Sequence, residues 1–131
     1  MPEEKPQFGT FCWTELMTGD IAAAKKFYTD LIGWKLVDQD MGNMTYTMIF
    51  PPGAQEPVGG MMAMEGTDFQ GVPPHWMPYI MVENVDQSAG KCAELGGKVV
   101  YPSTDIPDIG RFCVIQDPTG ATIALYQNKA G

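Results

Sequence analysis

The residues FCWTELMTGDIAAAKKFYTDLIGWKL (11–36) decide the fold, because they carry a strand, a helix and a turn in order. The opening run FCWTELMT (11–18) is rich in aromatic and β-branched residues, which favours a strand. From Asp20 onward, apolar residues recur three or four positions apart, as they do on one face of a helix. We expect Thr18 or Asp20 to cap this helix and Gly33 to end it.

The same pattern returns in the second half of the chain. WMPYIMV (76–82) predicts a strand, and NVDQSAGKCAELGG (84–97) predicts a helix. In this helix, Asn84 and Gln87 resemble a capping box, and the glycine pair at 96–97 marks the end.

Three strand-like runs separated by turn residues follow each predicted helix. They are WKLVDQD (34–40), MTYTMIF (44–50) and VGGMMAM (58–64) in the first half, and KVVYPS (98–103), RFCVIQ (111–116) and TIALYQ (122–127) in the second. Asp20 corresponds to Asp86 at an offset of 66 residues, and PPGA (51–54) corresponds to PTGA (118–121). We therefore predict an α+β fold of two βαβββ modules.

Length and composition predict one domain. The chain has 131 residues, and 44% of them are hydrophobic, which suffices for a core at a length typical of single domains. We expect residues 1–131 to form one domain, with a first module at about 8–64 and a second module at about 76–127. The residues between them, 65–75, are rich in glycine and proline and predict a linker.

Charge and hydropathy exclude several classes of function. Sixteen acidic residues against eight basic ones give a net charge of −8, and such a chain repels the phosphates of nucleic acids. No run of about 18 apolar residues occurs, so we expect no membrane span. The first residues, MPEEKP, are polar and lack an apolar h-region, so we expect no signal peptide. Three cysteines without close spacing argue against a disulfide framework or a clustered zinc site. We therefore expect reduced thiols and a cytoplasmic protein.

Two local sequences and the internal repeat together resemble the vicinal oxygen chelate superfamily, which includes glyoxalases, bleomycin-resistance proteins and extradiol dioxygenases. Residues 11–36 are similar to its first strand, helix and glycine turn, and QDPTGATIALYQ (116–127) is similar to its closing strand. The resemblance spans about residues 8–127 and is closest to the glyoxalase-related branch with W-x-E-L in the first strand. It implies curled, mixed β-sheets around a cavity that binds a small molecule.

The resemblance also locates the positions where metal-dependent members carry their ligands. In this sequence those positions fall on residues without a suitable metal-binding group: Trp13, Met77 or its neighbour Trp76, Ala124, and Gly60 or Met61. His75, the only histidine, is expected in a loop. We therefore expect no metal and no cofactor.

Strand alternation predicts the side chains that line the cavity. Trp13 and Glu15 share one face of the first strand, so if Trp13 faces the cavity, Glu15 does too. A carboxylate beside a tryptophan in a partly dry pocket can act as a general base; the alternative is a solvated or structural position. We expect the other cavity residues to be aromatic, sulfur-containing or small: Tyr79, Met77, Tyr46, Met48, Met61 and Ala124. For each of them, ordinary core packing is the alternative.

Arg111 is the only arginine in the chain, and its role has two interpretations. Its guanidinium can bind an acidic group of a ligand. Alternatively it pairs with the neighbouring Asp105 or Asp108, and we favour this pairing.

Three functions remain open. The first is a glyoxalase-like small-molecule-binding protein that acts without metal on a small carbonyl or aromatic compound, as a lyase or isomerase with Glu15 as base. The second is a non-catalytic, ligand-sequestering protein of the bleomycin-resistance type. The third is a metal-dependent lactoylglutathione lyase with displaced ligands. The residues favour the first and leave catalysis itself open.

We also expect a homodimer. The superfamily resemblance implies it by analogy, and two-fold pairing is the commonest form of self-association. Aromatic residues beside proline or glycine loops are candidates for the interface: Phe8, Phe69 and Trp76.

Overall fold

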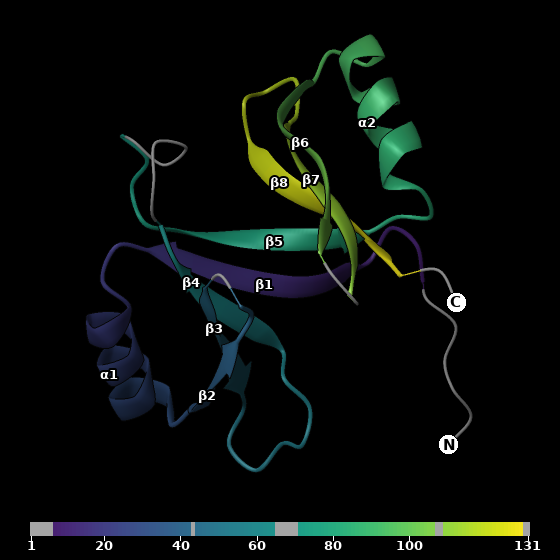
Figure 1. Ribbon diagram of the computed structural model, residues 1–131. Helices are drawn as coiled ribbons and strands as arrows, with labels where there is room; N and C mark the ends of the chain where they lie inside the picture. Colours follow the sequence, from purple (N-terminus) through teal and green to yellow (C-terminus); the bar gives the residue numbers. More distant parts are fainter. Residues whose placement is uncertain (1–6, 43, 65–70, 107–108, 130–131) are drawn as a thin grey trace. The chain divides into compact units, whose positions relative to one another are not determined.

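The computed structural model describes residues 7–42, 44–64, 71–106 and 109–129, and within them it contains eight strands and two helices (Figure 1). The order is strand, helix and three strands, repeated twice. The elements are β1 (Phe11–Thr18), α1 (Ile21–Ile32), β2 (Lys35–Asp40), β3 (Thr45–Phe50), β4 (Gly59–Ala63), β5 (His75–Met81), α2 (Val85–Glu94), β6 (Lys98–Ile106), β7 (Gly110–Gln116) and β8 (Thr122–Asn128). The predicted α+β fold of two βαβββ modules is confirmed.

Backbone contacts divide the chain into two compact units. The first unit is Trp13–Met77, and the second unit combines the residues up to Cys12 with those from Pro78 onward. Both boundaries fall inside strands, in β1 and β5, so each unit takes most of one module. The predicted linker lies partly outside the described residues, and its last residue, His75, begins β5. The grouping of residues 1–131 into one domain stays a prediction.

Each unit forms a four-stranded mixed sheet, and the two sheets have the same topology. The strand order is β2-β3-β4-β1 in the first unit and β6-β7-β8-β5 in the second. Neighbouring strands are antiparallel, except that β1 with β4 and β5 with β8 are parallel. Glu15 pairs with Gly60, and Tyr79 pairs with Ala124, at a separation of 45 positions in both units. The internal repeat is therefore present in the pairing register as well as in the order of elements.

The helix ends carry the caps that the sequence predicts. The Asp20 carboxylate accepts a hydrogen bond from the Ala23 N–H at 3.0 Å, and the Asn84 side chain accepts one from the Gln87 N–H at 3.0 Å. Gly33 ends α1 with a φ of 83°, in the left-handed region that favours glycine. The two N-caps are 64 positions apart, so the predicted correspondence of Asp20 with Asp86 at 66 is wrong. Asp86 lies inside the first turn of α2 rather than at its cap.

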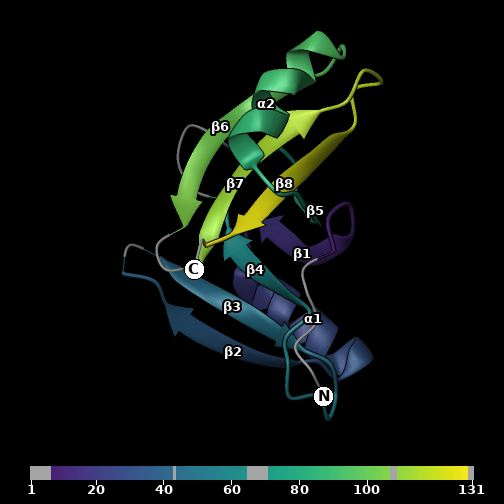
Figure 2. The ribbon, with the colours of Figure 1, turned by 90° about the vertical axis from the view of Figure 1, so that its right-hand side faces the viewer.

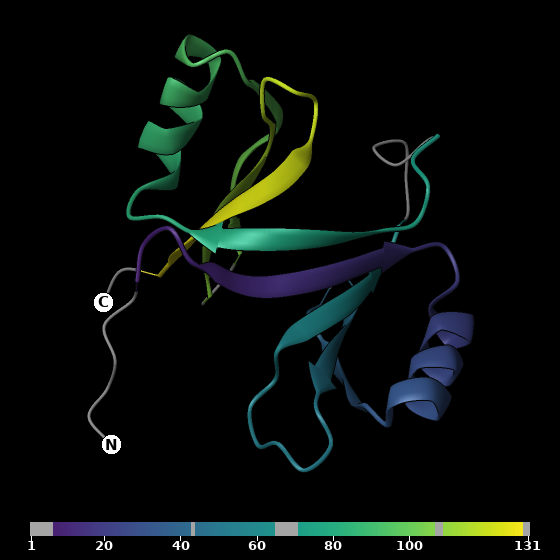
Figure 3. The ribbon, with the colours of Figure 1, turned by 180° about the vertical axis from the view of Figure 1, so that it is seen from behind.

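One face of each sheet packs against the helix of its own unit; we call this the helix face and the opposite side the distal face. In the first unit α1 packs against β2 and β4, and in the second α2 packs against β6, β7 and β8 (Figures 2 and 3). The first core contains Leu16, Ile49 and Met61 with Ile21, Ala24 and Tyr28 of the helix. The second contains Val85, Cys113 and Leu125 with Ile80, Val82, Ala89 and Ile115.

Alternation along each strand then assigns the distal faces. Because Leu16 faces α1, Trp13 and Glu15 lie on the distal face of the first unit. The three cysteines, Cys12, Cys92 and Cys113, are free, as predicted. In the described part of the chain, the helices are too short and too polar to cross a membrane.

Candidate functional site

A hydrogen-bonded chain of three side chains lies on the distal face of the first unit. The Trp13 Nε1–H donates to the Tyr46 hydroxyl oxygen at 2.8 Å, and the Tyr46 hydroxyl donates to Glu15 Oε2 at 2.7 Å. An indole nitrogen can only donate, so the hydroxyl of Tyr46 accepts from Trp13 and its own hydrogen points to the carboxylate. Consecutive hydrogen bonds that run in one direction polarise one another. The bond from Trp13 to Tyr46 therefore strengthens the bond from Tyr46 to Glu15.

Gly60 makes this arrangement possible. It lies on β4 beside Glu15 and opposite Met48 of β3. A Cβ atom at position 60 would overlap the ring and hydroxyl of Tyr46. Because position 60 has no side chain, the Tyr46 ring crosses β4 and reaches Glu15 on β1. The carboxylate that results is buried, with the residue only 6% exposed.

The second unit repeats this geometry with apolar groups. Val114, Ala124 and Tyr79 pair across β7, β8 and β5 in the way that Met48, Gly60 and Glu15 pair in the first unit. Phe112, two positions before Val114, corresponds to Tyr46, and its ring lies 6.2 Å from the ring of Tyr79. An aromatic side chain thus reaches across a small residue in both units. In the second unit it meets a tyrosine, and in the first unit it meets a carboxylate.

Tyr101 adds a third ring to the Tyr79–Phe112 pair of the second unit. Its ring stacks on Phe112 at 5.7 Å and 15°. Register shifts flank it in the pairing of β6 with β7, between Val99 and Tyr101 and between Tyr101 and Thr104. Bulges of this kind redirect side chains, and Tyr101 consequently pairs with Val114 on the distal face.

The structure brings together some of the predicted cavity residues and separates others. Trp13, Glu15 and Tyr46 meet, and Met48 shares their face of the sheet. Met61 does not join them, because it is fully buried in the helix-side core with Leu16 and Ile49. Met77, Tyr79 and Ala124 are buried on β5 and β8. A cavity that combines Trp13 and Glu15 with Tyr79 and Ala124 stays a prediction, since these pairs belong to different units.

Arg111 pairs with carboxylates of its own chain. Its guanidinium lies 2.9 Å from Asp105 and 3.1 Å from Asp86. The pairing with Asp105 was predicted, the pairing with Asp86 was not, and Asp108 lies outside the described residues. Hydrogen bonds from Arg111 hold the pKa of the Asp86 carboxyl below its usual range, and those to Asp105 and Asp86 raise the pKa of Arg111. Alternation on β7 places Arg111 on the helix face, away from Phe112.

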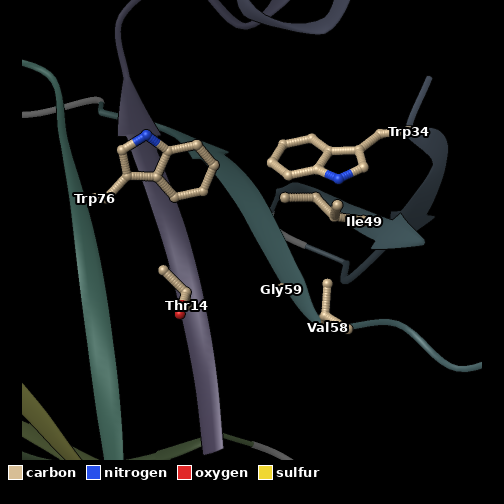
Figure 4. A pocket seen from close by; sticks show the side chains of 6 residues that line it. All are labelled: Thr14, Trp34, Ile49, Val58, Gly59 and Trp76. Carbon is tan, nitrogen blue, oxygen red and sulfur yellow. The ribbon is translucent and has the colours of Figure 1, made fainter. Parts of the chain in front are cut away.

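A pocket of about 390 Å³ opens on the helix face of the first unit (Figure 4). It is lined by Thr14, Trp34, Ile49, Val58, Gly59 and Trp76. Figure 4 shows the two indoles at one side of the opening, with the Val58 and Thr14 side chains across from them. The sequence did not predict this pocket, because its pattern places Trp34 in a strand and makes Trp76 a candidate for a dimer interface.

The donor groups of the described residues do not fit a divalent metal ion. Among them no three His, Cys, Asp or Glu side chains lie close enough together to hold one. The positions that the superfamily resemblance predicts for metal ligands carry indole, thioether and methyl groups at Trp13, Met77 and Ala124, which are poor partners for such ions. The prediction that His75 lies in a loop is wrong, because His75 is the first residue of β5. Its Nδ1 donates a hydrogen bond to the Pro73 carbonyl at 2.9 Å.

Burial raises the pKa of two thiols of the second unit, Cys12 and Cys113. Burial, with a smaller contribution from Cys92 and Asp86, raises the pKa of the Cys113 thiol to about 11. Burial also raises the pKa of Cys12, whose Sγ donates to the Tyr79 carbonyl at 3.6 Å. Only thiolates are strong nucleophiles, so neither group is a candidate for covalent catalysis.

A family model described as Glyoxalase/Bleomycin resistance protein/Dioxygenase superfamily matches residues 10–125. The chain belongs to this superfamily, as its repeat and its sheet topology predicted. The crystal structure of methylmalonyl-CoA epimerase from Mycobacterium tuberculosis has the same fold, with a TM-score of 0.64 at 18% identity over 93% of this chain and 89% of that one.

Two curated relatives have informative names. "Putative glyoxylase CFP32" of Mycobacterium tuberculosis is 42% identical over 91% of this chain and 46% of its own length. "Anthracycline biosynthesis protein DnrV" of Streptomyces peucetius is 29% identical over 91% of this chain and 47% of its own length. The chain thus spans about half the length of the curated relatives it matches.

Replacing Tyr46 with phenylalanine tests the hydrogen-bonded chain. Tyr46→Phe removes the hydroxyl that accepts from Trp13 and donates to Glu15, and we expect it to lower the free energy of unfolding by about 1–3 kcal/mol. Urea denaturation measures this loss. Tyr101→Phe, at an exposed ring, is the control and should change stability by less than about 0.5 kcal/mol. Equal stability of Tyr46→Phe and the wild type would contradict the role given to this hydroxyl.

Proposed function

We propose that this protein binds a small carbonyl or aromatic compound and that Glu15 transfers a proton on it without a metal ion. The chain belongs to a superfamily whose members bind small molecules. The carboxylate of Glu15 lies buried on the distal face of the first unit, close to the indole of Trp13 and the phenol of Tyr46. This is the environment in which a carboxylate serves as a general base.

The observation that carries the proposal is the difference between the two units. The second unit fills the position equivalent to Glu15 with Tyr79, and the position equivalent to Tyr46 with Phe112. The fold is therefore satisfied by an aromatic pair at this place. Burying a carboxylate costs free energy unless it is hydrogen-bonded. In the first unit Glu15 is buried, and the hydrogen bond from Tyr46, which itself accepts from Trp13, offsets part of this cost. A role in chemistry explains why the acid is there.

The geometry suggests how the base works. The hydrogen bond from the Tyr46 hydroxyl to Oε2 fixes the orientation of the Glu15 carboxylate. Glu15 removes a proton from a carbon next to the substrate carbonyl, and the electrons of the broken C–H bond move into the carbonyl as an enolate. The protonated Glu15 then returns the proton to the opposite face of the same carbon or to the enolate oxygen, which gives an isomerised product.

The class of ligand has independent support in the names of the relatives. One is named a glyoxylase, and the other is named for anthracycline biosynthesis. On the distal face of the first unit, the aromatic and sulfur-containing side chains of Trp13 and Met48 suit a small aromatic or carbonyl ligand.

The alternatives predict different behaviour. A ligand-sequestering protein would bind aromatic compounds without changing them, and the stack of the exposed Tyr101 ring on Phe112 favours this second function. A metal-dependent lactoylglutathione lyase needs several converging donors, and the ligand positions of this chain do not supply them.

Glu15→Gln tests the proposed proton transfer. In D₂O the wild-type protein should accelerate hydrogen–deuterium exchange at the carbon next to the carbonyl of acetophenone or hydroxyacetone, as followed by NMR. The variant should lose about 10²–10⁴-fold of this rate. Glu83→Gln, an exposed glutamate, is the matched control and should keep it. Equal rates in Glu15→Gln and the wild type would refute the base, and binding without exchange in any of these proteins would favour sequestration.

Elemental analysis tests the proposed independence from metal. We expect the purified protein to contain no stoichiometric transition metal, because Trp13, Met77 and Ala124 occupy the ligand positions. Its exchange activity should survive dialysis against EDTA. About one zinc, nickel, iron or manganese ion per chain, lost together with activity on chelation, would overturn this part of the proposal.

We further propose that the protein is a cytoplasmic homodimer. The free thiols are compatible with a reducing compartment. Of the residues suggested for the interface, Phe8 is exposed, Trp76 lines the pocket of Figure 4 and Phe69 lies outside the described residues. Helix α1 offers a better candidate, because Phe27 and Leu31 are four positions apart and share one face of the helix.

Leu31→Glu tests this interface. Leu31 and Leu95 are both 65% exposed, so a glutamate is tolerated by the monomer at either position. We expect Leu31→Glu to weaken dimerisation at least tenfold, which is about 1.4 kcal/mol, whereas Leu95→Glu leaves it unchanged. Sedimentation over a range of protein concentrations measures both. A wild-type monomer at micromolar concentration would refute the dimer.

A further inference from the structure

The aromatic walls of the pocket in Figure 4 are held in place before any ligand binds. The indoles of Trp34 and Trp76 lie 6.0 Å apart at 75°, which forms a corner. Tyr28 of α1 supports both, because its ring stacks on Trp34 at 5.0 Å and meets Trp76 edge-on at 5.5 Å. The Trp76 Nε1–H also donates to the Tyr28 hydroxyl at 3.3 Å. Walls fixed in this way lower the entropy that binding costs.

The floor of the pocket depends on a missing side chain. A Cβ atom at Gly59 would collide with the carbonyl oxygen of Thr14 and would approach Ile49 Cδ1 to 3.7 Å. Gly59 thus lets β4 lie close to β1 and leaves space above the strand. The resulting volume of about 390 Å³ is within the range of about 300–1,000 Å³ typical of small-molecule sites.

The lining decides the chemistry of the ligand. The six residues that line the pocket carry no charged group, and Thr14 has the only aliphatic hydroxyl among them. An ionic group would lose its hydration there without a partner of opposite charge. The chain also carries a net charge of −8, which repels anions at long range. A flat, uncharged ring suits the corner of two indoles, because aromatic rings prefer edge-to-face and offset contacts.

This pocket is separate from the site of the proposed function. Thr14 and Glu15 are neighbours on β1, and Gly59 and Gly60 are neighbours on β4, so each pair points to opposite faces of the sheet. The pocket lies on the helix face, while the Trp13–Tyr46–Glu15 chain lies on the distal face.

We propose that the helix-face pocket of the first unit is a second binding site, which takes an uncharged aromatic small molecule against the corner formed by Trp34 and Trp76. The site does not depend on Glu15, and it stands even where the proposed proton transfer fails.

A matched pair of fluorescent probes tests this assignment. N-phenyl-1-naphthylamine is uncharged, and 1-anilinonaphthalene-8-sulfonate has the same rings with a sulfonate added. We expect saturable binding of the uncharged probe, seen as enhanced emission, with one site per chain that the pocket variants below remove. The sulfonate should bind at least about tenfold more weakly at low salt, with a smaller difference at high salt as repulsion is screened.

Two variants at Val58 locate the site, because this pocket residue is 52% exposed and tolerates change. Val58→Asp places a charge at the wall, and Val58→Trp fills the space without charge. Both should weaken the uncharged probe at least about tenfold. Val100→Asp, at a valine that is 48% exposed on β6, adds the same charge elsewhere and should leave affinity within about twofold.

Three results would overturn the proposal. The first is that the uncharged probe fails to saturate, or binds Val58→Asp and Val58→Trp as well as the wild type. The second is equal affinity for the two probes at low salt. The third is a wild-type protein that does not bind the probe and forms a dimer that Val58→Asp dissociates, since a second copy of the chain would then close the pocket.

Discussion

The parallel pairing of β1 with β4 is the contact on which the first unit depends. It joins residues 45 positions apart and places Gly59 and Gly60 beside Thr14 and Glu15. Two consecutive glycines then serve opposite faces of one strand. Gly59 lets the backbones approach and leaves the floor of the helix-face pocket, while Gly60 lets Tyr46 cross to Glu15. A side chain at either position would block one of these two arrangements.

Duplication of the βαβββ unit separates what the fold requires from what the first unit adds. Both units have the same strand order, the same parallel register and an aromatic residue that crosses a small one. The second unit closes this arrangement with a ring, Tyr79, and needs no buried charge. The first unit holds a carboxylate with a tyrosine and a tryptophan. The same backbone thus supports an aromatic pair in one copy and a hydrogen-bonded, buried carboxylate in the other.

The net charge of the chain and the uncharged lining of the helix-face pocket would act on a ligand at different distances. The acidic surface biases which ligands approach, because the field of many charges extends over about a Debye length, roughly 8 Å at physiological salt. The uncharged lining of the helix-face pocket acts only on contact. Arg111, the single arginine, pairs with Asp86 and Asp105 on the helix face of the second unit.

Local sequence by itself determined the elements of this protein, the helix caps at Asp20 and Asn84, the repeat and the superfamily, because periodicity and turn residues act over a few positions. It also placed Trp13 and Glu15 on one face of β1. The tertiary structure alone decided that Tyr46 bonds to both of them, that Met61 lies in the core and that Trp34 meets Trp76. These contacts join residues about 30 to 45 positions apart, and strand register and a missing Cβ at Gly60, rather than local pattern, select them.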